Sequence, residues 1–172
     1  MPKLDGILET VIHTEDLVRA RAFYEGVLGL EPIYSDNRLS AYAVAGRDVL
    51  LVFRKGATGQ TVVLPSGTIP GHGGDGVLHV AFAISKDELD RWEAHLASRG
   101  VDIEGRNDWE RGGLSLYFRD PDGHRFGTGN AGIVVDLLGT CASRATDPNR
   151  PDVRLGQKQT FAAHKLMSAK CQ

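Results

Sequence analysis

Glu9 and His79 are the residues of this sequence whose type and position point most directly to chemistry. Each stands third in a β-type segment, Ile7–Ile12 and Val77–Phe82, and the two segments align residue by residue. A carboxylate in a mostly apolar strand needs a partner. Imidazole and carboxylate groups together bind Fe(II), Mn(II) or Zn(II). The competing interpretations are a core histidine bonded to the backbone and a glutamate on a solvated strand face.

Two further histidines lie near these segments. His13 is four residues past Glu9, on the same face of the strand and roughly 13 Å further along at ~3.3 Å per residue. That separation is too great for both side chains to bind one metal. We expect His13 either to contact a substrate at the rim of the site or to be a plain surface histidine. His72, in a glycine-rich loop, is expected to be solvated or to belong to a lid.

Bulk composition excludes several classes of protein. The chain has 172 residues, enough for one domain with a real core, and its net charge of -2 gives no sign of a nucleic-acid or membrane partner. Cys141 and Cys171 lack the CxxC spacing, so a disulfide framework is not expected. No secretory leader or membrane-length apolar run is visible. The sequence therefore predicts a cytoplasmic protein with a small-molecule partner.

The elements that must position these residues occur twice. The first set comprises a strand with Glu9, a helix that Thr14 caps and Gly29 ends, three short strands and a long loop. The second comprises a strand with His79, a helix that Gly100 ends, and strands before a tight turn. The predicted ranges are strands 7–13, 31–35, 39–44, 49–54, 77–84, 101–105 and 114–119, helices 17–28 and 86–99, loop 55–76 and turn 120–123.

This order predicts an α+β fold made from a duplicated half-domain. A repeat of about seventy residues is too long for a solenoid. The side chains expected to be buried between helices and curved sheets are Val11, Phe23, Leu28, Val80, Phe82, Trp92, Leu96 and Phe118.

Three motifs in this order resemble the vicinal-oxygen-chelate superfamily, which includes glyoxalases, bleomycin-resistance proteins and extradiol dioxygenases. They are Asp16–Leu30, Leu78–Phe82 and Tyr117–His124, and the resemblance covers residues 4–124. It implies paired βαβββ modules whose mixed sheets curl into a cup around a divalent metal. The implied domain is 1–128, with repeats at about 4–56 and 76–128, followed by a tail at 129–172.

The resemblance also implies the metal ligands. By position, Glu9 and His79 are the first two, and the third falls on Gly127, which has no side chain to offer. The strand 49–53 lacks the carboxylate that glyoxalase I enzymes use as a fourth ligand, which favours a three-ligand site. His13, Arg54 and Tyr117 are the expected substrate contacts, with a solvated strand end as the alternative for Arg54.

The chain departs from the family pattern after His124. A shifted reading frame beginning in the Arg125 codon can encode Val-Leu-Glu-Leu-Ala-Thr-Pro-Gly-Leu-Trp-Ser-Thr-Tyr and a stop, which resembles the ending of family members. We therefore hypothesise that the tail is frameshifted and not native. The alternative is a genuine extension in which Ile133–Leu138 forms the last strand and Asp136 supplies the third ligand.

Two functions follow from the resemblance. One is a metal-dependent lyase or dioxygenase-like enzyme, using Fe, Mn, Zn or Ni and acting on a small oxygen-chelating substrate, impaired here by loss of the third ligand. The other is a metal-free protein that binds or sequesters a small molecule, as bleomycin-binding relatives do. A defective enzyme created by the frameshift is a third possibility. The resemblance further implies a homodimer.

Overall fold

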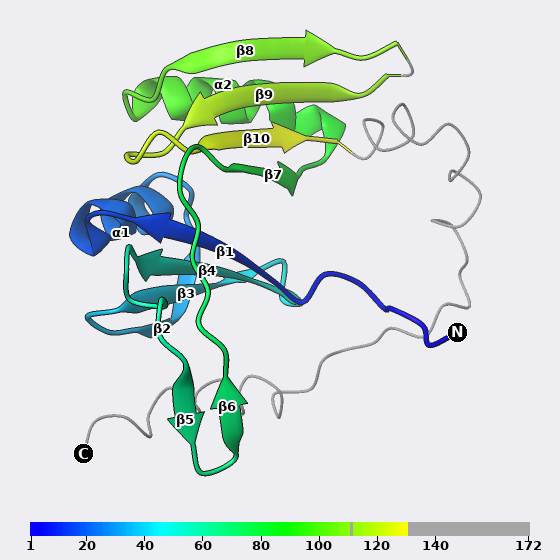
Figure 1. The fold of residues 1–172 in the computed structure, drawn as a ribbon. Coiled ribbons are helices and arrows are strands. Elements are labelled where there is room, and N and C mark those ends of the chain that lie inside the picture. Colours follow the sequence, from blue (N-terminus) through cyan, green and yellow to red (C-terminus); the bar gives the residue numbers. More distant parts are fainter. Residues whose placement is uncertain (111, 131–172) are drawn as a thin grey trace. The chain divides into compact units, whose positions relative to one another are not determined.

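The computed structural model describes residues 1–110 and 112–130, which form two compact units. The first unit runs to Asp75 and the second begins at Gly76. Each contains a strand, a helical segment and three further strands in the same order (Figure 1). The α+β fold with paired βαβββ modules is therefore confirmed. Ile133–Leu138, Asp136 and the rest of the tail beyond residue 130 lie outside the described residues.

The first unit is built on a four-stranded mixed sheet with one helix. Its elements are β1 Glu9–Thr14, α1 Leu17–Gly26, β2 Glu31–Ser35, β3 Leu39–Val44 and β4 Asp48–Arg54. The strand order is β1-β4-β3-β2, with β1 parallel to β4 and the other pairs antiparallel. This register places Glu9 beside Val49 and His13 beside Phe53.

Helix α1 begins at a cap that differs from the predicted one. The Asp16 carboxylate accepts hydrogen bonds from the backbone N–H groups of Val18 at 2.8 Å and Arg19 at 3.2 Å. Thr14, the predicted cap, instead bonds through its hydroxyl to the backbone of Asp16. The prediction was wrong by two residues because both side chains suit a helix N-terminus, and only the backbone path decides between them.

The two faces of this sheet have different roles. Tyr42 packs its ring 5.7 Å from that of Tyr24 on α1, so the face of Tyr42, with Leu50 beside it, is the helix side. The opposite face carries a second apolar cluster of Leu39, Ala41, Leu51 and Phe53. Val11 packs against this second cluster. The prediction that Val11 lies between the helix and the sheet was therefore wrong. Val11 is two residues from Glu9 on the same strand, so both side chains project to the face of the sheet away from α1.

The second unit repeats the arrangement. Its elements are β7 His79–Ala83, the 3-10 turn η1 Lys86–Glu88, α2 Leu89–Ser98, β8 Ile103–Asp108, β9 Leu114–Arg119 and β10 Arg125–Gly129. The strand order is β7-β10-β9-β8, with β10 parallel to β7. The sequence did not predict β10. This strand lies between β7 and β9 and is the last strand of the sheet within the described residues.

Four of the eight expected core residues are buried. Phe23 and Leu28 in the first unit, and Leu96 and Phe118 in the second, are almost inaccessible to solvent. Val80, Phe82 and Trp92 are only half-buried. Phe126 of the unpredicted strand completes this core, with its ring 5.8 Å from Phe82 and 6.2 Å from Phe118.

The loop predicted over 55–76 contains a small hairpin. Its strands are β5 Val62–Leu64 and β6 Gly67–Ile69, which pair antiparallel and extend away from the β1-β4-β3-β2 sheet (Figure 1). Pro65 and Ser66 form the turn between them, and Gly67, which has a positive φ, follows directly. The prediction of one continuous loop over 55–76 was therefore wrong at residues 62–69.

In the part of the chain that the structure describes, neither helix has the length and apolar character needed to cross a membrane.

Candidate metal and substrate site

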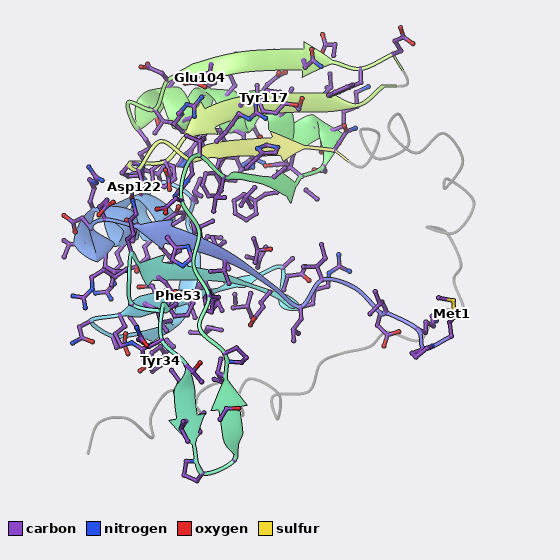
Figure 2. The ribbon with its side chains drawn as sticks, viewed as in Figure 1. Met1, Tyr34, Phe53, Glu104, Tyr117 and Asp122 are labelled. Atoms are coloured by element: carbon purple, nitrogen blue, oxygen red, sulfur yellow. The ribbon has the colours of Figure 1, made fainter. Side chains whose placement is uncertain are left out.

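His79, Tyr117, Arg125 and the backbone position of Gly127 share one face of the second unit's sheet. The register pairs His79 with Arg125, and pairs Gly127 with Tyr117. Paired residues project to the same side of a sheet. The His79 and Tyr117 ring centroids are 6.1 Å apart, and the Arg125 guanidinium carbon lies 5.7 Å from the Tyr117 centroid. Tyr117, marked on β9 in Figure 2, thus adjoins the predicted ligand His79.

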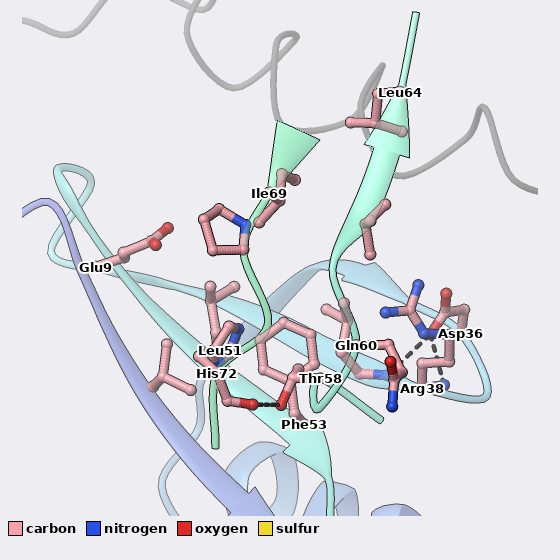
Figure 3. Close-up of a pocket in the computed structure, with 14 residues that line it drawn as sticks. Glu9, Asp36, Arg38, Leu51, Phe53, Thr58, Gln60, Leu64, Ile69 and His72 are labelled. Carbon is pink, nitrogen blue, oxygen red and sulfur yellow. Dashed lines mark hydrogen bonds between the residues drawn. The ribbon is translucent and has the colours of Figure 1, made fainter. Parts of the chain in front are cut away.

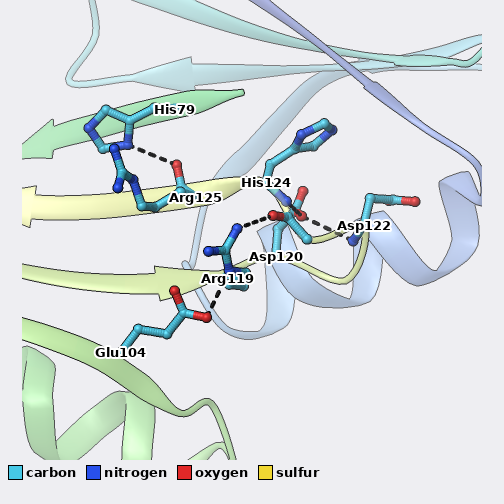
Figure 4. Close-up of polar contacts among 8 residues, drawn as sticks. His79, Glu104, Arg119, Asp120, Asp122, His124 and Arg125 are labelled. Atoms are coloured by element: carbon cyan, nitrogen blue, oxygen red, sulfur yellow. Dashed lines mark hydrogen bonds and ion pairs between the residues drawn. The ribbon is translucent and has the colours of Figure 1, made fainter. Parts of the chain in front are cut away.

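The backbone fixes the tautomer of His79. Its Nδ1 lies 3.1 Å from the carbonyl oxygen of Arg125 (Figure 4). A carbonyl oxygen can only accept, so Nδ1 carries the proton and Nε2 of the neutral ring keeps its lone pair. Histidines that bind metals almost always donate their other N–H to a carbonyl or carboxylate in this way. His79 is therefore exposed, oriented and in the tautomer that a metal ligand requires.

A side chain at position 127 would start next to the His79 imidazole. A Cβ atom built on Gly127 would lie 3.5 Å from Cε1 of His79, the carbon between the two ring nitrogens. It would also contact the Cβ of Ala81 at 3.5 Å and the carbonyl oxygen of Leu116 at 3.4 Å. A side chain at this position would run alongside His79. Glycine supplies none, and no group of three or more His, Cys, Asp or Glu that could hold a metal occurs among residues 1–110 and 112–130.

The remaining charges near this face belong to structural pairs. Arg119 donates to Glu104 at 2.8 Å and to the carbonyl oxygen of Gly123 at 2.7 Å (Figure 4). The hydrogen bond from Arg119 holds the pKa of Glu104 below its ordinary value. Asp120 accepts from the backbone N–H groups of Asp122 and His124, which fixes the turn before β10. These contacts set the path of the chain into the strand that carries position 127.

Glu9 opens onto a cavity of about 260 Å³ in the first unit (Figure 3). The side chain of Glu9 is exposed, and Val11, two residues on, lines the same space. The other lining residues come from the turn between β2 and β3, from β3 and β4, and from the segment around the hairpin: Asp36, Arg38, Leu39, Leu51, Phe53, Thr58, Gln60, Val62, Leu64, Ile69, Pro70 and His72. The predicted first ligand thus stands at the edge of a mainly apolar chamber. Because Glu9 belongs to the first unit and His79 to the second, a metal shared by the two stays a prediction.

Asp36 and Arg38 are the charged residues on the far wall of this cavity. The Asp36 carboxylate accepts from the backbone N–H groups of Arg38 at 2.7 Å and Leu39 at 2.8 Å, and from the Tyr34 hydroxyl at 3.0 Å. Burial raises the pKa of Asp36, but these hydrogen bonds outweigh it, so the pKa lies below the ordinary value. Asp36 is therefore a charged turn residue at neutral pH.

His13 is buried and fastens the hairpin segment to β1. Its side chain belongs to a residue only 9% exposed, which excludes a plain surface histidine. Nε2 lies 3.2 Å from the Thr58 hydroxyl, which donates to the carbonyl oxygen of His72 at 2.7 Å. The hydroxyl has one proton, so it accepts from His13 and donates to His72. The His72 ring lies 5.9 Å from that of His13 and 5.5 Å from Phe53.

Thr58 is the site residue that the sequence analysis missed. No short motif marks it, because its partners His13 and His72 lie 45 and 14 residues away along the chain. The hairpin had a detectable signal, since Val62 to Leu64 and Thr68 to Ile69 flank a Pro-Ser-Gly turn. His72, expected to be solvated or in a lid, is exposed and lines the cavity.

Arg54 and Lys55 lie away from the cavity. Arg54 is exposed at the end of β4, with the opposite parity to the cavity residue Phe53. Lys55 forms ion pairs with Glu15 at 2.9 Å and Asp75 at 3.3 Å, and its hydrogen bonds to them raise its pKa. The ion pair with Asp75 joins the two ends of the segment 55–75. The charge of Lys55 is thus already paired with two carboxylates.

Comparison with known proteins agrees with this architecture. Residues 6–128 match the model of the Glyoxalase/Bleomycin resistance protein/Dioxygenase superfamily. The chain is 32% identical to the metallothiol transferase FosB of Lysinibacillus sphaericus over 124 residues, which span 72% of this chain and 80% of that protein. It is 30% identical to the crystal structure of lactoylglutathione lyase from Agrobacterium tumefaciens, with a TM-score of 0.70 over 77% of this chain and 98% of the other.

A more distant neighbour shares the fold alone. The fosfomycin resistance protein FosX of Mesorhizobium loti is 21% identical, with a TM-score of 0.55 over 78% of this chain and 99% of the other. The repeated βαβββ modules, the three motifs and the matches to these proteins lead to one conclusion. This chain belongs to the glyoxalase/bleomycin resistance protein/dioxygenase superfamily, the vicinal oxygen chelate proteins.

Proposed function

We propose that this protein derives from a divalent-metal-dependent enzyme that acts on a small molecule with neighbouring oxygen atoms. Glu9, His79 and a carboxylate at position 127 would hold the metal. The observation that carries this proposal is the joint geometry of His79 and Gly127. The imidazole has its Nδ1–H on a backbone carbonyl, and a side chain at 127 would start 3.5 Å from its ring.

The donor set fits a divalent first-row metal only in part. One imidazole and one carboxylate are the ligand types that such ions accept, but the chain as written lacks the third. A bound metal would supply Lewis acidity and orient the substrate oxygens. The protein's own contribution is to fix the His79 ring through the Arg125 carbonyl and to place the Glu9 charge beside an apolar cavity.

The burial pattern of β10 supports the frameshift hypothesis. Phe126 and Thr128 point into the core, with 0% and 1% of their surface exposed, whereas position 127 faces His79. The shifted frame would place leucine at 126 and 128 and glutamate at 127, so apolar residues would fill the buried positions. In the chain as given, the buried Thr128 hydroxyl finds no hydrogen-bond partner within the described residues. A buried unpaired hydroxyl costs free energy that a leucine would not.

A metal titration tests the proposal. The protein with the frame-corrected ending should bind Zn²⁺ or Mn²⁺ far more tightly than the chain as given. Four-ligand zinc sites bind with ~10–16 kcal/mol, or about 3 kcal/mol per ligand, so the regained carboxylate should strengthen binding about 100-fold. Calorimetry or competition with a chromophoric chelator measures this.

The matched control is the same corrected ending with glycine retained at position 127. It separates the carboxylate from every other change in the tail, and it should bind no better than the chain as given. His79→Gln in the corrected protein should also remove the gain. Tight metal binding by the chain as given, through Asp136 or another tail residue, would refute the proposal and favour a genuine extension.

A second candidate function is metal-free binding of a small molecule. Gly127 and the apolar cavity of the first unit favour it, since the chain as written keeps a chamber and lacks a ligand. Elemental analysis of the purified protein distinguishes the two. A stoichiometric first-row metal supports the enzyme, and its absence in the frame-corrected protein supports the binder.

A further inference from the structure

We propose that the cavity of the first unit binds an apolar group of one or two rings, carried by the substrate beside its chelating oxygens. This inference rests on the proposed function, because it takes the occupant to be that enzyme's substrate. It names a substrate class, an aromatic or alicyclic compound, that the metal site alone does not define.

The sheet supplies an apolar floor. Val11 of β1, Leu51 and Phe53 of β4 line the cavity on the face away from α1. Leu51 is 7% and Phe53 8% exposed, and both are held in place within the apolar cluster that they form with Leu39 and Ala41. A floor fixed in this way is preformed, and a ligand that contacts it loses little free energy in ordering the protein.

The β5–β6 hairpin supplies the facing wall. Its register pairs Val62 with Ile69 and Leu64 with Gly67, so the side chains of Val62, Leu64 and Ile69 project to one side. All three line the cavity, and Val63, between two of them, is 75% exposed and does not (Figure 3). Ile69 is itself 45% exposed, which leaves apolar surface that a ligand would cover. The wall is therefore apolar on its inner side.

The size of the cavity indicates a ring. Its volume of about 260 Å³ exceeds the ~150 Å³ of an apolar cavity that binds benzene and approaches the lower end, ~300 Å³, of ligand pockets in general. One ring would leave space, and two fused rings would fill it. A three-carbon compound would leave most of the apolar wall in contact with water.

The charges around the cavity disfavour a phosphonate. Glu9 and Asp36 are carboxylates, and Arg38 is the cation among the described lining residues. The Arg38 guanidinium already donates to the carbonyl oxygen of Ala57 at 3.3 Å. A doubly charged phosphonate would be repelled by the two carboxylates, and the one guanidinium that could attract it already has a hydrogen-bond partner. A neutral ring would meet no electrostatic repulsion.

Binding of 1-naphthol to the metal-free, full-length protein tests the inference, with fosfomycin as the compact phosphonate. After treatment with a chelator, calorimetry should detect 1-naphthol and give little or no heat with fosfomycin. Val62→Asp places a carboxylate inside the cavity and should weaken 1-naphthol binding at least about tenfold. Val63→Asp is the matched control, because it makes the same change one residue along on the outer side and should leave binding unchanged.

Weak binding of 1-naphthol, tighter binding of fosfomycin, or equal effects of the two valine substitutions would overturn the inference. Circular dichroism of both variants shows whether the hairpin change has disturbed the fold. The metal titration of the corrected protein is a separate measurement. Naphthol binding without metal binding would therefore refute the proposed enzyme alone, and metal binding without naphthol binding would refute the ring-binding cavity alone.

Discussion

Two buried threonines should respond in opposite directions to the same substitution. Thr128 is 1% exposed and its hydroxyl has no hydrogen-bond partner in the described part of the chain, whereas the Thr58 hydroxyl joins His13 to His72. Valine has nearly the shape of threonine without the hydroxyl. Thr128→Val should therefore stabilise the protein, and Thr58→Val should destabilise it.

The magnitudes follow from these contacts. Removing an unsatisfied buried hydroxyl relieves about 1–3 kcal/mol, and valine also suits a strand better than most residues. Thr58→Val loses two hydrogen bonds worth ~0.5–1.5 kcal/mol each, or about 1–3 kcal/mol together. In a chain of this size each kcal/mol moves the unfolding midpoint by about 2–4 °C. The two variants should thus differ by several degrees, on either side of the starting protein.

Thermal denaturation followed by circular dichroism measures both shifts. Thr58→Ser keeps the hydroxyl and is the control for lost packing, so it should retain more stability than Thr58→Val. Hydrogen exchange at the His72 amide, which donates to the Thr58 carbonyl at 2.9 Å, should speed up in Thr58→Val. A Thr128→Val protein that is no more stable than the original would refute the unpaired-hydroxyl argument and weaken the frameshift hypothesis with it.

Further predictions concern Tyr42 and two glycines of the first unit. Burial raises the pKa of Tyr42 to about 12, above its unfolded value near 10, and its hydroxyl donates to Glu25 at 3.1 Å. The folded state therefore holds this proton more tightly, so stability from Tyr42 is complete below pH ~10 and is lost as the pH rises through about 12. Denaturant titrations should show this alkaline loss, and Tyr42→Phe should abolish that part of it. Gly71→Ala would bring a Cβ within 2.7 Å of the Gly59 carbonyl oxygen and should cost about 1–3 kcal/mol. Gly73→Ala, where nothing lies within 4 Å, should leave the unfolding midpoint unchanged.

Local patterns predicted the repeated elements well where they were long and periodic. The ranges of β2, β3 and β9 agree residue for residue with those expected, and both helices start within three residues of the predicted position. The errors fall where a short segment depends on distant partners. The strand β10 has two glycines among its five residues, so its own sequence gives little β propensity. It forms a strand because β7 and β9 bond it on both sides.

The sequence by itself determined the duplicated module and the equivalence of Glu9 and His79, because both depend on neighbours along the chain. The resemblance to the family also marked position 127 as the predicted place of a third ligand. Only the tertiary structure decided that the Arg125 carbonyl fixes the His79 tautomer, that position 127 adjoins that ring, and that a hairpin walls the cavity at Glu9. These features join residues tens of positions apart through strand register and loop packing. The free energy that selects them comes from contacts that no local pattern of residues records.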